Sequence, residues 1–394
     1  MKNILVIALC VALIGFAGYN VVQNQNKAAT SVDQPSLQPQ NNSTTGTTTQ
    51  DTTDIPAVSI VAENLDTPWA LAFLPASQAG GPDESLLITE RAGTVRLVDS
   101  QGTLQPTPVA TLSTVEEIGE GGLLGITIHP QFSTNKYVYL YYTYDSANEN
   151  TLNRVVRMTF QNNTLQNEEI IVDKIPGASN HNGGRIRFGP DGFLYIGTGD
   201  AQEPSQAQNT STLGGKILRV TDDGKPAPGN VLNNAAYSYG HRNVQGLAWN
   251  SAGDLWATEH GRSGIQSGLD ELNLVENGKN YGWPEIEGDE KRAGMEISER
   301  NSGSTTWAPS GADFVGDRLF FSGLRGQTLY EAVISGNTVA EVKEHFNGEY
   351  GRIREVITGP DGMLYITTSN KDGRGIPKNG DDKVLRINPN KLRT

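Results

Sequence analysis

Cysteine is nearly absent from this sequence of 394 residues: there is one, Cys10, and it lies inside the first apolar run. A disulfide framework and thiol chemistry are therefore excluded for the rest of the chain. Aromatic residues make up only 7% of the sequence, and 45 Gly and 19 Pro divide the apolar residues into short runs. Long helical bundles are disfavoured, and we expect a core built from many short strands.

Blocks of basic residues are also lacking. The chain has 31 Lys+Arg against 44 Asp+Glu, a formal net charge of −13. Because a negative surface repels phosphate backbones, we expect no nucleic acid partner. Basic residues that bind a ligand should therefore be few and individually placed.

The amino terminus predicts export. Lys2 is followed by an apolar stretch from Ile4 to Gly18, which matches the charged start and apolar centre of an export signal. The length of this run is borderline between a cleaved signal and a short membrane anchor. Residues 1–22 are interpreted as one or the other, with residues 4–22 as the membrane tether in the second case. The protein is predicted to be periplasmic or otherwise extracytoplasmic.

Residues 23–54 have the composition of a flexible linker. They contain no aromatic residue and are dominated by Gln, Asn, Ser and Thr. Such a segment cannot bury enough apolar area to offset the entropy lost on ordering. The folded domain is therefore expected to span residues 55–394.

A repeat in the folded region predicts the fold class. Short apolar strands that end in a turn recur roughly 45 to 65 residues apart, and most are followed by a second apolar strand. This spacing is typical of propeller blades. The predicted fold is all-β, a six-bladed β-propeller. The first strands of the six units begin at Trp69, Leu124, Arg185, Gly246, Gly311 and Val356.

Two segments with the same turn chemistry support this interpretation. Gly189-Pro-Asp-Gly192 and Gly359-Pro-Asp-Gly362 place Pro and Gly where tight turns need them. In a propeller, the ends of the inner strands and the loops that follow them should meet at one mouth. We expect the functional residues in those loops.

Two histidines contrast in their surroundings. His129 precedes Pro130 in a turn and is expected to be structural, whereas His181 lies in the polar segment Ala178-Ser-Asn-His-Asn-Gly-Gly-Arg185. An accessible imidazole there could act as a general base. The alternative is a loop histidine bonded to a neighbouring backbone carbonyl.

Arginines occur at comparable places in several units, namely Arg242, Arg325, Arg352 and Arg354. Gathered at one mouth of an acidic protein, they would suit a ligand with several carboxylates. Ordinary salt bridges to acidic residues of the blades are the alternative. The segment Glu259-His-Gly-Arg262, followed by Asp270-Glu-Leu-Asn273, has the oxygen ligands of a calcium site, although a solvated acidic loop has the same composition.

Together these motifs resemble the glucose/sorbosone dehydrogenase family of quinoproteins. The matching stretches follow the family order across roughly residues 60 to 390. They are Gly119-Glu-Gly-Gly-Leu-Leu-Gly125, His181-Asn-Gly-Gly-Arg185, Gly240-His-Arg-Asn-Val-Gln-Gly246, Glu259-His-Gly261, Asn280-Tyr-Gly-Trp-Pro284, Thr306-Trp-Ala-Pro-Ser310, Arg352-Ile-Arg354 and Thr368-Ser-Asn-Lys-Asp-Gly-Arg374.

The resemblance implies an aldose sugar dehydrogenase that holds pyrroloquinoline quinone (PQQ) and Ca²⁺ at the mouth of the propeller. It would oxidise the C1 hydroxyl of aldoses to lactones by hydride transfer to the quinone, and an unidentified acceptor would then take the electrons. His181 resembles the base, and Arg242 the cation beside the reacting carbonyl. The residues that resemble cofactor contacts are Arg242, Asn243, Thr306, Arg325, Arg352 and Arg354.

Metal and substrate residues follow from the same resemblance. The carbonyl oxygens of Gly261 and Arg262 match calcium ligands, and Glu271 and Tyr281, with Asp270, resemble a second calcium site. Glu120 and Asn180 match substrate contacts, but soluble glucose dehydrogenase has glutamine and aspartate at these two places. We therefore expect the imidazole of His181 to lack the carboxylate that would orient it.

Three readings stay open at this point. The first is the exported sugar dehydrogenase. The second is a six-bladed calcium lactonase, which would need no set of arginines at the mouth. The third is a non-catalytic propeller that binds a partner at the cell surface. The sequence leaves the choice between a monomer and a homodimer open.

Overall fold

The computed structural model describes residues 55–75, 85–146 and 151–392, to which the following statements refer. Contacts divide the chain into two units, Met1–Asp51 and Thr52–Thr394. The predicted signal or anchor and the predicted linker, residues 1–22 and 23–54, lie outside the described residues. None of the helices in the described part is long and apolar enough to cross a membrane.

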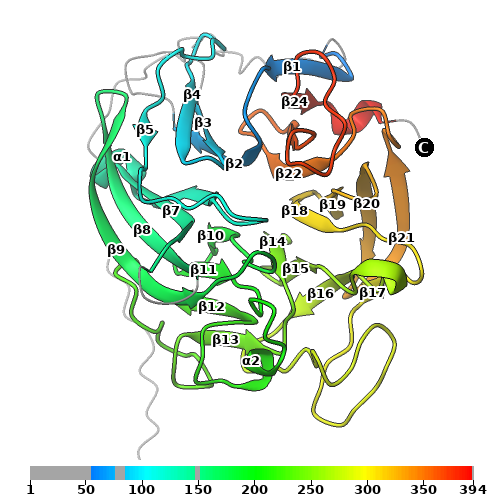
Figure 1. The fold of residues 1–394 in the computed structure, drawn as a ribbon. Coiled ribbons are helices and arrows are strands. Elements are labelled where there is room, and N and C mark those ends of the chain that lie inside the picture. Colours follow the sequence, from blue (N-terminus) through cyan, green and yellow to red (C-terminus); the bar gives the residue numbers. More distant parts are fainter. Residues whose placement is uncertain (1–54, 76–84, 147–150, 393–394) are drawn as a thin grey trace, which may run out of the picture. The chain divides into compact units, whose positions relative to one another are not determined.

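Six four-stranded antiparallel sheets form a ring of blades, and the predicted six-bladed β-propeller is confirmed (Figure 1). The first two blades are β2 (Pro68–Leu74), β3 (Ser85–Glu90), β4 (Thr94–Val98) and β5 (Ala110–Thr111), then β6 (Leu123–Ile128), β7 (Tyr137–Tyr144), β8 (Leu152–Gln161) and β9 (Thr164–Pro176). The next two are β10 (Ile186–Phe188), β11 (Leu194–Gly197), β12 (Lys216–Val220) and β13 (Ala236–Tyr239), then β14 (Val244–Trp249), β15 (Leu255–Glu259), β16 (Glu271–Val275) and β17 (Arg300–Asn301). The fifth is β18 (Pro309–Val315), β19 (Arg318–Gly323), β20 (Thr328–Ser335) and β21 (Thr338–His345).

The sixth blade closes the ring with strands from both ends of the folded region. It consists of β22 (Ile353–Thr358), β23 (Leu364–Thr368), β24 (Val384–Ile387) and β1 (Val58–Ala62). In Figure 1 the first strand, in blue, lies beside the last, in red, and Val58 pairs with Ile387. The repeat in the sequence did not reveal this closure, because β1 precedes the first recognisable unit.

Burial explains why the inner strands read as continuous apolar runs. Nearly every residue of β2 and β14 is buried, since a neighbouring blade packs on each face. The outer strands β9 and β21 are largely exposed, and their sequences are correspondingly polar. Side chains of consecutive blades share one core: Trp69, Leu124 and Ile186 belong to the same buried cluster.

The two predicted tight turns are present. Gly192 and Gly362 have φ angles of 79° and 73°, which suit glycine, and each donates its N–H to the first glycine of its turn at 2.9 Å. The place of the polar loops differs from the prediction, however. They precede the innermost strands instead of following them, because in an antiparallel blade the start of the inner strand lies at the same edge as the end of the second strand.

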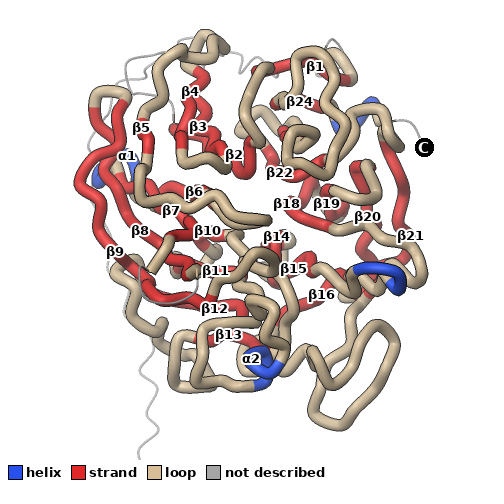
Figure 2. The backbone as a smooth tube through the Cα atoms, in the orientation of Figure 1, coloured by secondary structure: helices blue, strands red, loops and turns tan. Residues whose placement is uncertain are grey.

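Helical segments are few and short (Figure 2): α1 (Phe132–Asn135), α2 (Ser205–Gln208), η1 (Gly264–Gln266) and η2 (Pro389–Lys391). The loop that carries α2 is held by Lys216, a fully buried side chain. Its Nζ donates to the carbonyl oxygens of Gln206, Ala207 and Gly214 at 2.7, 3.1 and 2.5 Å. Below about pH 7, the protonated amine has one N–H donor for each of these three oxygens.

Stability should depend on pH through Lys216. Burial lowers the pKa of Lys216 from its ordinary value of 10.5 to about 7. Between these values the unfolded chain binds a proton that the folded chain has released, so the free energy of unfolding should rise with pH by at most about 1.4 kcal/mol per unit through this group. Urea unfolding of wild type and Lys216→Met from pH 7 to pH 10 measures it. A variant whose pH dependence matches the wild type would contradict the prediction.

Candidate active and cofactor site

A cavity of about 420 Å³ lies where the polar loops meet. Its lining comes mainly from segments before or at the start of the innermost strands of blades two to six and from segments after the second strands of blades three to six. Six arginines line it, namely Arg242, Arg262, Arg325, Arg352, Arg354 and Arg374. The predicted convergence of guanidinium groups is thus present in the fold, and the residues come from the fourth, fifth and sixth blades.

His181 lies at the edge of this cavity and is held by a carboxylate. Its Nδ1 is 2.7 Å from Oδ1 of Asp200, and the other carboxylate oxygen, Oδ2, accepts the Nε1–H of Trp283 at 2.8 Å. Asp200 is fully buried. If Nδ1 carries the hydrogen that this network requires, Nε2 is the free, basic nitrogen. His181 also has a φ of 61°, an uncommon value that places the ring by backbone geometry.

The expectation that the imidazole lacks an orienting carboxylate is therefore wrong. Asn180 does not supply one, since its side-chain oxygen accepts a hydrogen bond from Arg374 at 3.0 Å. Asp200 takes that role from the loop after β11, and its own N–H bonds to the carbonyl of Arg242 at 2.8 Å. The sequence signal was the segment Gly197-Thr-Gly-Asp200, an acidic residue directly after a strand of a blade.

Arg242 is buried beside the same group of residues. Its Nη2 donates to Oγ of Ser263 at 3.0 Å, its Nη1 lies 3.3 Å from the carbonyl of His260, and its guanidinium stacks over the Trp283 ring at 5.3 Å. The Trp283 side chain thus contacts both Asp200 and Arg242. Because Asp200 holds His181, Trp283 links the two residues predicted to be catalytic, His181 and Arg242. The sequence did not indicate this role.

Asn243, the neighbour of Arg242, is fully buried and supports the His181 loop. Its Oδ1 accepts the N–H of Gly183 at 2.9 Å, and its Nδ2 lies 3.5 Å from Nδ1 of His260. Since the amide can only donate at that contact, Nδ1 of His260 accepts and Nε2 carries the hydrogen. Burial lowers the pKa of His260 to about 3, although the Glu120 charge opposes this, so the ring is neutral at pH 7.

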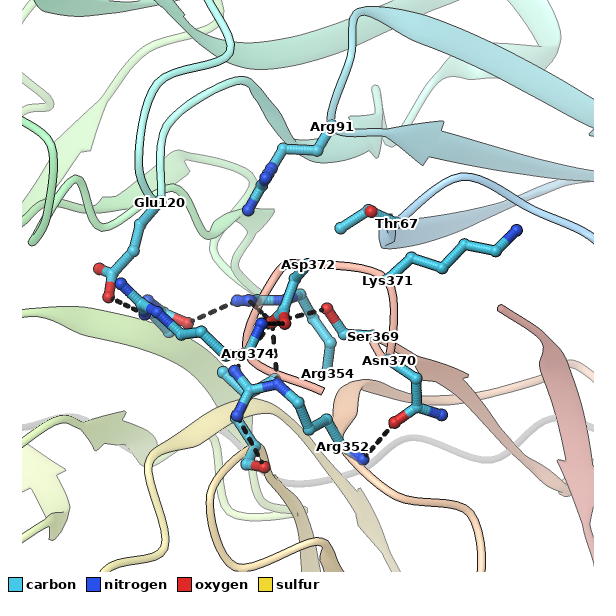
Figure 3. A network of polar contacts seen from close by, with 12 residues as sticks. Thr67, Arg91, Glu120, Arg352, Arg354, Ser369, Asn370, Lys371, Asp372 and Arg374 are labelled. Atoms are coloured by element: carbon cyan, nitrogen blue, oxygen red, sulfur yellow. Dashed lines mark hydrogen bonds and ion pairs between the residues drawn. The ribbon is translucent and has the colours of Figure 1, made fainter. Parts of the chain in front are cut away.

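Arg352 and Arg354 are buried side by side and share Asp372 (Figure 3). Oδ2 of Asp372 accepts from Nε and Nη2 of Arg352 at 2.9 and 2.8 Å and lies 3.8 Å from Nη2 of Arg354. Nη1 of Arg354 donates to Oε1 of Gln245 at 3.1 Å. Burial, together with the Arg352 charge and against that of Asp372, lowers the pKa of Arg354 to about 9.

Thr306 and Arg325 line the same cavity from the fifth blade. Oγ1 of Thr306 donates to Oγ of Ser267 at 2.9 Å. Arg325 is exposed, and within the described part of the chain its guanidinium forms no ion pair. The structure thus places every predicted cofactor contact except Asn243 in the lining of one cavity.

Buried donors without acceptors show what kind of ligand fits. Within the described chain, Nε of Arg242, Nε of Arg354 and Nε2 of His260 are buried without a hydrogen-bond partner. All three are donors and belong to residues that line the cavity. Because orphaned buried donors are costly, this arrangement fits a ligand rich in carboxylate and carbonyl oxygens. The residues therefore fit PQQ, a flat quinone that carries three carboxylates.

Residues predicted to hold metal lie beside this cavity. Gly261 and Arg262 line it, and a Cβ at Gly261 would lie 2.2 Å from the carbonyl oxygen of Leu269, so only glycine fits there. Gly261 and Arg262 also line a second cavity of about 20 Å³, together with Glu259, Glu271 and Glu287. Burial and the neighbouring Glu259 raise the pKa of Glu271 to about 8, which indicates that a cation would be favourable.

Tyr281 fits a metal site less well. Its hydroxyl donates to the carbonyl of Leu274 at 2.6 Å and accepts the N–H of Glu276 at 2.9 Å, and its ring stacks on His241 at 4.8 Å. Its main-chain carbonyl is therefore the ligand it could offer. No cluster of three or more His, Cys, Asp or Glu side chains that could hold a metal occurs among the described residues.

The glucose/sorbosone dehydrogenase family matches residues 65–378 of the chain. The chain belongs to this family. As a member of the glucose/sorbosone dehydrogenase family, the protein is an oxidoreductase, which replaces the hydrolytic and the non-catalytic readings. The resemblance stated from the motifs is confirmed.

Relatives within the family agree with this assignment. The aldose sugar dehydrogenase YliI of Escherichia coli is 31% identical over 365 residues, 84% of this chain and 92% of that protein. The quinoprotein glucose dehydrogenase B of Acinetobacter calcoaceticus is 32% identical over 265 residues, 58% of this chain and 52% of that one. The PQQ-bound structure of the aldose sugar dehydrogenase of Streptomyces coelicolor has a TM-score of 0.76 and 39% identity, covering 84% of this chain and 98% of that one.

Proposed function

We propose that the protein oxidises aldoses at C1 to lactones with PQQ as the resident cofactor. The observation that carries the proposal is the cavity itself, whose lining combines guanidinium and imidazole groups that have unpartnered donors with a carboxylate-bound histidine. The oxygens of a quinone with three carboxylates would accept hydrogen bonds from these donors. When bound, PQQ supplies the two-electron acceptor that takes the hydride from C1.

His181 is the proposed base of this reaction. Its Nε2 accepts the proton of the C1 hydroxyl, while Asp200 holds Nδ1–H and stabilises the imidazolium that forms. Trp283 fixes the second oxygen of Asp200 and so keeps the carboxylate in the plane needed for that contact. The hydroxyl proton is thus held at Nε2 of His181, separately from the hydride that would leave C1.

The cationic residues have separate proposed roles. Arg242 is linked to the His181–Asp200 pair through Trp283, and it would stabilise negative charge that develops on the cofactor oxygen. Arg352 and Arg354 would bind carboxylates from the buried side, and Thr306, Arg325 and Asn243 would complete the contacts. Glu120 and Asn180 would contact the sugar.

Calcium is the second proposed cofactor. The carbonyl oxygens of Gly261 and Arg262 would hold it against the quinone, and Glu271, with the carbonyl of Tyr281, would hold a further ion. Hard carbonyl and carboxylate oxygens are the ligands that Ca²⁺ prefers. The same proposal includes export through residues 1–22 to a periplasmic or extracytoplasmic compartment. It also includes transfer of the electrons to a separate acceptor.

Reconstitution tests the proposal directly. Purified protein is treated with EDTA, desalted, and supplied with PQQ and Ca²⁺ separately and together, and dye reduction is followed with several aldoses. We expect activity only when both are added, since the donors need the quinone and its carbonyl needs the cation. Activity without PQQ, or no activity and no quinone absorbance after desalting, would contradict the proposal.

A further inference from the structure

The rim of the cavity carries a contact between three loops that the proposed catalytic and cofactor roles do not use. Arg374, in the loop after β23, donates from Nη1 to Oε1 of Glu120 at 2.5 Å (Figure 3). Its Nη2 donates to Oδ1 of Asn180 at 3.0 Å. Glu120 precedes β6 and Asn180 precedes β10. We name these three residues the rim triad. It joins loops of the sixth, second and third blades.

The rim triad lies at the end of the cavity where the proposed base is found. The second oxygen of Glu120, Oε2, accepts the main-chain N–H of His181 at 3.1 Å. All three residues of the triad line the same cavity as His181. A sugar that presents C1 to the imidazole therefore meets Glu120 and Arg374 beside the base.

The two charges of the triad depend on each other. Burial alone would raise the pKa of Glu120, but His260 and the hydrogen bond and charge of Arg374 lower it to about 2. Glu120 is thus ionised at neutral pH, and Arg374 is its guanidinium partner within hydrogen-bond distance. The buried arginines Arg352 and Arg354 share one counter-charge, Asp372, which is 3.8 Å from Arg354. Glu120 is the carboxylate within hydrogen-bond distance of Arg374, so the charge of the rim triad itself depends on the Glu120–Arg374 pair.

Stability alone does not explain this pair. The side chain of Arg374 is 52% exposed, and ion pairs at such positions add little to the stability of a fold. A guanidinium has five N–H donors, and within the described chain its bonds to Glu120 and Asn180 account for two of them. The others are available to solvent or to the hydroxyl oxygens of a bound sugar.

We propose that Arg374 is a specificity-determining residue that balances the charge of Glu120 at the sugar end of the cavity, and that the paired charges make the site select neutral aldoses over aldoses that carry a carboxylate. The inference rests on the proposed function. A neutral sugar can donate to Glu120 and accept from Arg374 without separating the pair. A sugar carboxylate meets a guanidinium that is already paired and a carboxylate that repels it.

Two charge-removing variants test this inference on the PQQ- and Ca²⁺-loaded enzyme. The measured quantity is the ratio of kcat/KM for glucuronate to kcat/KM for glucose, two sugars that differ by a carboxylate at C6. In Glu120→Gln the freed guanidinium should raise this ratio about tenfold or more, and in Arg374→Gln the freed carboxylate should lower it about tenfold or more. The double variant should return toward the wild-type ratio.

Two further variants serve as controls. Arg374→Lys keeps the charge and should retain most of the wild-type ratio, which distinguishes the charge from a misfolded loop. Arg91→Gln removes another guanidinium of this region, one that pairs with Glu117 at 2.8 Å and does not line the cavity. It should leave the ratio within about twofold.

The results separate failure of the proposed function from failure of the specificity role of Arg374. Wild-type enzyme that oxidises no aldose would contradict the proposed function and remove this inference with it. Wild-type enzyme that oxidises aldoses, with the same ratio in Glu120→Gln and Arg374→Gln as in wild type, would overturn the specificity role alone. Equal losses for both sugars in the two variants would show that the triad only holds the loops together, which also contradicts the inference.

Discussion

Replacing His181 by alanine should lower kcat for aldose oxidation by about 10²- to 10⁴-fold, the usual contribution of a general base. The reason is that Nε2 is the free nitrogen of a ring whose Nδ1 is held by Asp200 at 2.7 Å. PQQ retention should be nearly unchanged, because the arginines at the cavity do not depend on this side chain. Steady-state kinetics and quinone absorbance after desalting measure the two effects separately.

Two companion variants sharpen the His181 result. Asp200→Asn keeps the shape of the side chain but removes the charge that stabilises the imidazolium, so kcat should fall while PQQ binding persists. His129→Ala is the matched control, because His129 packs against Phe188 at 5.3 Å and does not line the cavity. If His181→Ala lost PQQ yet turned over normally in its remaining loaded fraction, the base role would be wrong.

Replacing Arg354 by alanine should weaken PQQ binding by about 30-fold or more, equivalent to about 2 kcal/mol, the lower range for loss of a buried charged partner. Arg354 is buried, its Nε is without an acceptor among the described residues, and it stands beside a second guanidinium. A ligand carboxylate would accept a hydrogen bond from this Nε and would reduce the repulsion between the two guanidinium groups. Titration of the apoprotein with PQQ, followed by fluorescence quenching, gives the dissociation constant without any need for turnover.

The control for Arg354 is Arg325, which lines the same cavity but is exposed. Water and salt screen an exposed cation, so Arg325→Ala should change the dissociation constant by less than about tenfold. Thermal melts of both apoproteins check that each variant folds. Equal losses in the two variants would contradict the idea that the buried guanidinium is the stronger part of the site.

The Asp372 contact explains why the two buried arginines should not contribute equally. Arg352 already gives Nε and Nη2 to Asp372 and Nη1 to the carbonyl of Leu324 at 3.1 Å. Arg354 has one hydrogen bond of comparable quality, to Gln245. More donor capacity is therefore left on Arg354, although the spacing of the Arg-Ile-Arg motif gave no reason to separate the two.

Several residues could be assigned from the sequence because their signal is local. The inner strands read as short apolar runs, the Gly-Pro-Asp-Gly turns have fixed conformational demands, and His181 stands in a polar approach to a strand. The six blades follow from repetition of these signals. The strand β1 was not foreseen because its partner, β24, lies at the other end of the chain, and one strand carries no repeat by itself.

The contacts around the predicted base were beyond such reasoning. Asp200 and Trp283 are 83 residues apart in the chain and meet at 2.8 Å, and Arg374 reaches Glu120 across 254 residues. No local pattern encodes a contact between two loops of different blades. The same holds within one blade: the identity of Asn180 suggested a missing carboxylate, but Asp200, in the loop after β11 of that blade, supplies one to His181.

The sequence by itself determined the class of fold, the number of blades and the kinds of side chain available at their loops, since these depend on periodicity and composition along the chain. The tertiary structure decided which of those side chains share a proton, a charge or a ligand. Hydrogen bonds and ion pairs act over only a few ångströms, so their partners exist only after the ring of blades has closed and brought distant loops to one cavity.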